Sequence, residues 1–154
     1  MQTDSNYDID RLNQLIETTL DSAEGYHDAA EANAASRFAS VFRTRAAARR
    51  QIATRLQAEV RRLGGTAEEG GTVMGAAKRW FDNLKNSISG DEASVLSEVE
   101  AGEDHLKAAF EIAMHDQKLS VDTQTIIAAA YATIAADHDQ LRDLKYNEQA
   151  RKAS

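Results

Sequence analysis

The chain contains no proline in 154 residues, and five of its eight glycines fall between Gly64 and Gly75. Proline and glycine are the residues that interrupt helices most strongly, so this distribution predicts long helices with one major break. Apolar residues recur at three- and four-residue spacings on both sides of the break, whereas strands have almost no support. We therefore expect an all-α fold with helices at about residues 8–32, 36–63, 91–117 and 121–148.

The links between these expected helices differ greatly in length. Three residues join the first helix to the second and the third to the fourth, so each of these pairs should form an antiparallel hairpin. The connection over residues 64–90 has 27 residues, enough to run the length of the molecule and make the second and third helices parallel. An apolar stripe in it predicts a short crossover helix over about residues 72–87, anchored by Trp80. This is the arrangement of a ferritin-like four-helix bundle, here a single domain over residues 1–154.

Composition excludes several classes of site. The chain has no cysteine, so any metal would be held by histidine, aspartate and glutamate alone. No apolar segment approaches the roughly 20 residues of a membrane span, and the net charge of -7 disfavours nucleic acid as a partner. Residues 1–35 carry eight acids against one arginine, whereas residues 36–63 carry eight arginines against one glutamate, which favours pairing of the first two helices. We expect a cytoplasmic protein without affinity for membranes or nucleic acid.

Charged residues interrupt the apolar faces of three expected helices. Arg45 and Arg49 fall near the middle of the apolar face of the second helix. Glu103 lies within the apolar stripe of the third helix, and Asp137 and His138 flank that of the fourth. Buried charges are costly unless they are paired, so the pattern predicts that these residues meet in the core.

The first helix contributes the Glu-x-x-His spacing of "EGYH", with His27 near its apolar stripe and Glu24 at the edge. With a rise of 1.5 Å per residue and the crossover topology, all the charged residues of the four helices reach heights of about 21 to 28 Å from one end. We therefore expect one polar layer in the core, made of Glu24, His27, Arg45, Arg49, Glu103, Asp137 and His138.

Two chemistries fit such a layer. A metal site would use carboxylate and imidazole ligands for iron, manganese or zinc, namely Glu24, His27, Glu103 and His138. In a salt-bridged layer, Arg45 and Arg49 pair with the carboxylates instead. The arginines favour the second interpretation, because a guanidinium binds no metal and its charge neutralises the carboxylates as a cation would.

Several segments resemble a bacterial family of small ferritin-like four-helix-bundle proteins classed as a domain of unknown function. They are "LNQLIETTLDSAEGYHDAAE", "LQAEVRRLGGTAEEGGTVMGAAKRWFDNLK", "EVEAGEDHLKAAF" and "ADHDQLRDLK", and they span about Leu12 to Lys145. The "RRLGG" turn followed by "KRWFDNLK" is the most specific part. The resemblance implies the ferritin-like fold but brings no established activity. Arg45, Ala48 and Arg49 stand where a di-iron pattern has Glu-x-x-His, which argues against a ferroxidase-type centre.

The sequence thus favours a non-catalytic interaction or stress-associated protein that needs no cofactor. The alternative is a metal-binding oxidoreductase or iron-handling protein, with iron or manganese as the cofactor. A third hypothesis is polyanion binding through the arginines of the second helix. A homo-oligomer or a protein partner stays open, since Met74, Trp80 and Phe81 could cover the bundle or meet a second copy.

Overall fold

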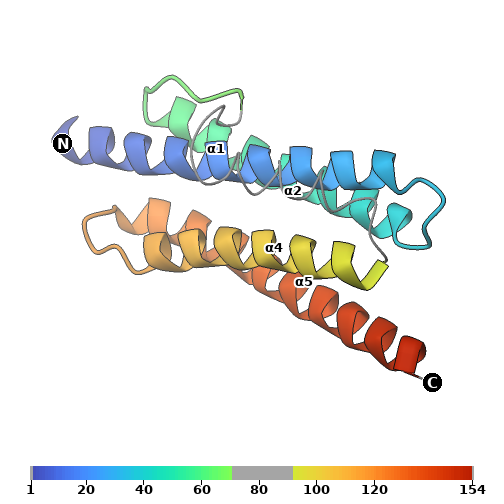
Figure 1. The fold of residues 1–154 in the computed structure, drawn as a ribbon. Helices are drawn as coiled ribbons and strands as arrows, with labels where there is room; N and C mark the ends of the chain where they lie inside the picture. Colours follow the sequence, from blue (N-terminus) through green and yellow to red (C-terminus); the bar gives the residue numbers. More distant parts are fainter. Residues whose placement is uncertain (1, 71–91, 154) are drawn as a thin grey trace.

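The computed structural model describes residues 2–70 and 92–153, and this part of the chain is helical without any strand. It holds four helices: α1 (Gln2–Ala32), α2 (Ala39–Arg62), α4 (Glu92–Met114) and α5 (Val121–Ala153) (Figure 1). The prediction of an all-α protein is confirmed. The expected crossover helix at residues 72–87, with Trp80, lies outside the described residues.

The ends of the helices follow from local chemistry. Gly64 has a φ of +88°, a left-handed conformation that ends α2, and the Gly65 N–H donates to the Val60 carbonyl at 2.9 Å. Ser120 precedes α5, and its Oγ accepts from the Thr123 N–H at 3.3 Å, as the residue at a helix start commonly does. α1 begins six residues earlier and α5 ends five residues later than the sequence predicted.

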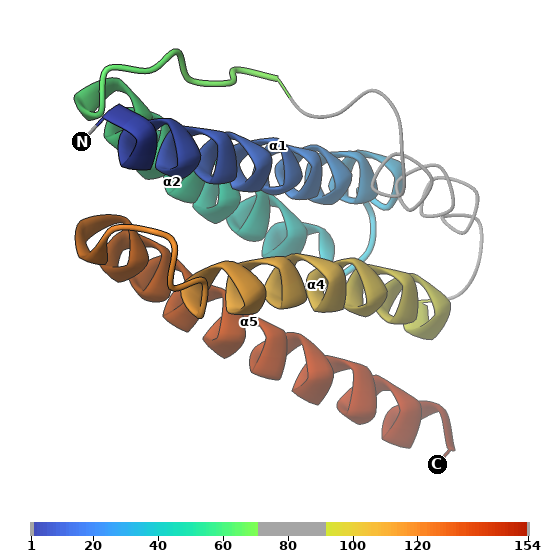
Figure 2. The ribbon, with the colours of Figure 1, turned by 90° about the vertical axis from the view of Figure 1, so that its left-hand side faces the viewer.

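The four helices form two antiparallel hairpins, α1 with α2 and α4 with α5, which face each other (Figures 1 and 2). α1 also lies beside α4, and α2 touches α5 over a short stretch. α2 and α4 run in the same direction and sit diagonally across the molecule, so every pair of adjacent helices is antiparallel. α5 is inclined to the other three helices in both views.

The core has two apolar clusters, one toward each end of the helices. One cluster joins all four helices and includes Leu12, Ile16, Ile52, Leu56, Val60, Leu106, Phe110, Ile127 and Ile134. The other includes Tyr26, Phe38, Phe42, Val95, Leu96, Val99 and Leu141. Each fully buried large side chain of these clusters contributes roughly 1.5–3 kcal/mol to folding. Among the residues described, no helix has the length and apolar character needed to cross a bilayer.

Candidate functional site

Two of the most deeply buried charges among the described residues form an ion pair between α2 and α4. Arg49 is 0% exposed, and its Nη2 donates to both carboxylate oxygens of Glu103 at 2.8 Å. Glu103 is 1% exposed. Burial is the largest single influence on the pKa of Arg49 and lowers it, but Glu103, Tyr26 and Asp137 together outweigh burial and the pKa is raised, so the guanidinium stays charged.

Four contacts of Arg45 and Arg49 extend this ion pair to α5. Arg49 Nη1 donates to Asp137 Oδ2 at 2.9 Å, and Arg45 Nε lies 3.6 Å from the same oxygen. Arg45 also donates to the Asp137 carbonyl at 3.2 Å and to Gln140 Oε1 at 2.6 Å. Two arginines and two carboxylates sum to zero formal charge, so the cluster neutralises itself without a further ion.

α1 contributes an aromatic side chain, Tyr26, rather than a charge. The buried Tyr26 hydroxyl donates to Glu103 Oε1 at 2.5 Å. The guanidinium carbons of Arg45 and Arg49 lie 5.8 and 6.0 Å from the centre of its ring, within the range of cation–π attraction. Burial and the nearby Glu103 charge raise the pKa of Tyr26 well above its ordinary value, so the phenol remains a hydrogen-bond donor.

The structure therefore brings together four of the seven residues expected in the polar layer: Arg45, Arg49, Glu103 and Asp137. We refer to these four with Tyr26 and Gln140 as the polar core cluster. Sequence reasoning missed Tyr26, although it lies three residues after the buried Ala23 and four before the buried Ala30, which is the signal of a core position. Gln140 follows Asp137 by one helical turn, which places both on the same side of α5.

The other three expected residues lie elsewhere, and their placement corrects the prediction. Glu24 and His27 are exposed, because the side chain that α1 directs inward at this height is Tyr26. His138 is 12% exposed and pairs through Nε2 with Asp104 of α4, outside the cluster. One position along a helix turns a side chain by about 100°, which is enough to move it off the core face.

The ligand set Glu24, His27, Glu103 and His138 consequently does not converge. Both oxygens of Glu103 accept from Arg49, and the two α1 residues are in solvent. No group of three or more histidine, aspartate or glutamate side chains in the described part of the chain is close enough to hold a metal ion. As the structure places them, these four residues do not form a carboxylate-bridged metal centre.

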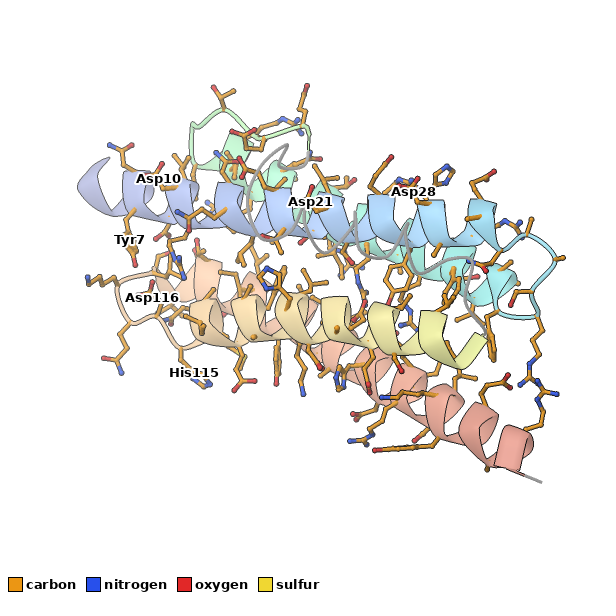
Figure 3. All side chains as sticks on the ribbon, viewed as in Figure 1. Tyr7, Asp10, Asp21, Asp28, His115 and Asp116 are labelled. Atoms are coloured by element: carbon orange, nitrogen blue, oxygen red, sulfur yellow. The ribbon has the colours of Figure 1, made fainter. Side chains whose placement is uncertain are left out.

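A second polar cluster joins the start of α1 to the turn between α4 and α5. Asp8 is 1% exposed and accepts from Ser120 Oγ at 2.6 Å and from Thr123 Oγ1 at 2.8 Å. Tyr7 donates to Asp116, and Figure 3 shows these two side chains pointing toward each other. The hydrogen bond from Tyr7 lowers the pKa of Asp116. Every bond in this cluster is internal, so it fastens α1 to the start of α5.

A third group fastens the far end of α5. Glu148 is 2% exposed and accepts from Arg37, which precedes α2, and from Arg151 Nε at 2.9 Å. Hydrogen bonds from Arg151 and Arg37 outweigh burial and lower the pKa of Glu148 to about 2. This carboxylate is therefore ionised at all physiological pH values.

The fold and the polar core cluster define an all-helical protein whose helices are joined in the core by arginine–carboxylate pairs. A family model described as a domain of unknown function (DUF2383) matches residues 8–116, and the chain belongs to this family. The matched segment contains Tyr26, Arg45, Arg49 and Glu103 and ends before α5. No curated protein and no solved structure matches the chain.

Proposed function

We propose that the chain is a ferritin-like four-helix bundle that acts as a non-catalytic interaction or stress-associated protein, with ion pairs where related folds hold a metal. The observation that carries the proposal is the position of Arg49. Its guanidinium is fully buried and bonds Glu103 and Asp137 at once. A cation held between two inward-facing carboxylates is the role that a metal would have, and here a side chain fills it.

The cost of displacing Arg49 supports this proposal. A metal at Glu103 would need an oxygen that now accepts from Arg49, so the guanidinium would have to leave a fully buried position. Moving a buried charge away from its partner leaves one of the two uncompensated, which costs about 3–5 kcal/mol. Binding of the metal by Glu24 and His27 would not offset this cost, because both side chains are exposed and would also have to turn inward.

Helix direction supports the ferritin-like part of the proposal. α2 and α4 are parallel and diagonal, and residues 63–91 separate them, whereas the other two connections are short. A single long connection between two hairpins is the feature that distinguishes this topology from a bundle with only short loops.

The polar core cluster would then serve to fix register. Arg45 and Arg49 reach both α4 and α5, so sliding α2 by one turn of about 5.4 Å would break all of their bonds together. Apolar contacts are less directional and tolerate such a shift better. We infer that the cluster selects one alignment of the helices, the best attested use of buried ion pairs.

Elemental analysis tests the proposal directly. The full chain, purified without chelators from cells supplied with iron and manganese, should carry either metal at far below one per chain. Glu103→Ala should lower the melting temperature of the metal-free protein, whereas Glu111→Ala, at an exposed position of α4, should leave it nearly unchanged. Stoichiometric metal that disappears in Glu103→Ala while the fold survives would overturn the proposal.

A further inference from the structure

α2 and α5 are less closely packed against each other than α1 is against α2 or α4 is against α5. Those two helices touch over a short stretch, whereas α1 follows α2 and α4 follows α5 along most of their length. An open groove of about 320 Å³ lies between α2 and α5. Its lining is apolar except for Arg55 and includes Ile52, Leu56, Ile126 and Ala129.

α5 carries more apolar surface than the other described helices cover. Of the 16 residues from Val121 to Ala136, 11 are apolar. Val121 is 75% exposed, and Ala129, Ala132 and Ala136 are also exposed. A helix that is apolar on most sides is normally buried on most sides, so this part of α5 indicates a surface that another chain covers.

The charges on the two sides of the groove have opposite signs. The exposed charges of α2 are all positive, because its one acid, Glu59, is buried; they are Arg43, Arg50, Arg55, Arg61 and Arg62. The exposed charges of α5 from residue 121 to 143 are mostly negative, with Asp122, Asp139 and Asp143 against Arg142; Asp137 is already paired with Arg45 and Arg49. A partner for this face therefore needs an acidic half over α2 and a basic half over α5.

A second copy of the same chain has that pattern. A two-fold rotation about an axis parallel to the helices places α2 of one copy over α5 of the other and keeps residues at the same height opposite each other. We propose that the α2–α5 face binds a second copy of this chain in this way, with the apolar groove at the centre and the charges at the rim.

The size of the face agrees with a stable dimer. α2 has 24 residues and is about 36 Å long. Two adjacent helices are about 20 Å wide, so the face offers on the order of 700 Å² per copy. Stable interfaces bury about 800 Å² per partner. Glu103 is not among the residues that line the groove, so the oligomeric state and the metal content of the protein can be measured separately.

Sedimentation equilibrium of the full chain tests the proposal. The wild-type protein should dimerise, and Ala129→Arg should raise the dimer dissociation constant by about tenfold or more, because it places a positive charge against Arg55 in the groove and against the arginines of α2 in the second copy. Ala108→Arg adds the same charge at an exposed position of α4 and should leave the constant unchanged. A wild-type chain that stays monomeric up to about 1 mM, or a dimer equally weakened by both variants, would overturn the proposal.

Cross-linking tests the predicted alignment, and the absence of cysteine makes it specific. Ala58 of α2 and Ala129 of α5 line the same groove and so lie at similar heights. Ala58→Cys mixed with Ala129→Cys should give a mixed dimer with a short bismaleimide in higher yield than either variant gives alone. Higher yields from the two separate variants than from their mixture would refute the arrangement of α2 over α5.

Discussion

Removing one member of the buried pair should destabilise the protein far more than removing both. Glu103→Gln leaves the guanidinium of Arg49, which is 0% exposed, with Asp137 as its one remaining ionic partner. Breaking a buried ion pair in this way costs about 3–5 kcal/mol, a large part of the roughly 5–15 kcal/mol that stabilises a typical domain. For a chain of this length the melting temperature should fall on the order of 10 °C. Arg49→Met should cost a similar amount, because it leaves the Glu103 carboxylate buried beside Tyr26.

The double variant Arg49→Met/Glu103→Leu provides the decisive comparison. It removes both charges and fills the space with apolar side chains of similar size, a replacement that is often close to neutral. Urea denaturation at pH 7 should therefore show a coupling free energy of about 2 kcal/mol or more between the two positions.

Arg61 of α2 and Glu69 offer a control pair in which both side chains are exposed. Arg61 Nη2 lies 3.6 Å from Glu69 Oε1, and the two side chains are 56% and 80% exposed. The double-mutant cycle of this pair should give less than about 1 kcal/mol, as for solvent-exposed pairs. If the buried single variants cost less than about 1 kcal/mol, or if their effects simply add, Arg49 does not act as a buried counter-charge and the proposed function loses its support.

Three further perturbations test other parts of the structure. Tyr26→Phe removes the hydrogen bond to Glu103 Oε1 and should lower the free energy of unfolding by about 1.5–3 kcal/mol in urea titrations; no change would mean that Arg49 alone satisfies the carboxylate. The pKa of Glu148 is lowered from 4.5 to about 2, so its stabilising contribution is complete above pH 4.5 and is lost as the pH falls toward 2. The melting temperature should fall over that range more steeply in wild type than in Glu148→Gln, and parallel curves would contradict the assignment. Gly64→Ala should lower the free energy of unfolding by about 1–2 kcal/mol, because a residue with a side chain is strained at a φ of +88°. An added methyl group would meet no other atom, so the backbone conformation is the sole source of this cost. A neutral result in thermal melts would show that the turn relaxes.

The sequence was sufficient to predict the four described helices, because the signals that form them are local. The lack of proline predicted long helices, and the glycine pair after Leu63 predicted the end of α2. Gly64 provides this end through its left-handed backbone. The early start of α1 could not be predicted in the same way. Within the added stretch Tyr7 donates to Asp116, a residue 109 positions away, and a local rule contains no such contact.

The polar core cluster shows where helical geometry is a reliable guide and where it is not. Height along a helix changes by 1.5 Å per residue, so an error of one position leaves the predicted height almost unchanged. Direction changes by about 100° per residue, so the same error turns a side chain from the core to solvent. For Arg49 and Glu103 the sequence predicted a position on the core face, and both side chains are buried. For Glu24 and His27 it predicted the height of the polar layer, but both side chains are exposed.

The polar core cluster and the α2–α5 face are linked through α5. Contacts between α2 and α5 are few, and those of Arg45 and Arg49 with Asp137 and Gln140 are among them. These bonds fix the distance between α2 and α5 next to the apolar groove, which stays open. A shorter side chain at position 49 would allow this distance to change, so the groove should change shape when the ion pair is lost. The buried charges would in this way help to keep open the surface on which a second copy could bind, which gives a structural reason for placing arginines in the core of α2.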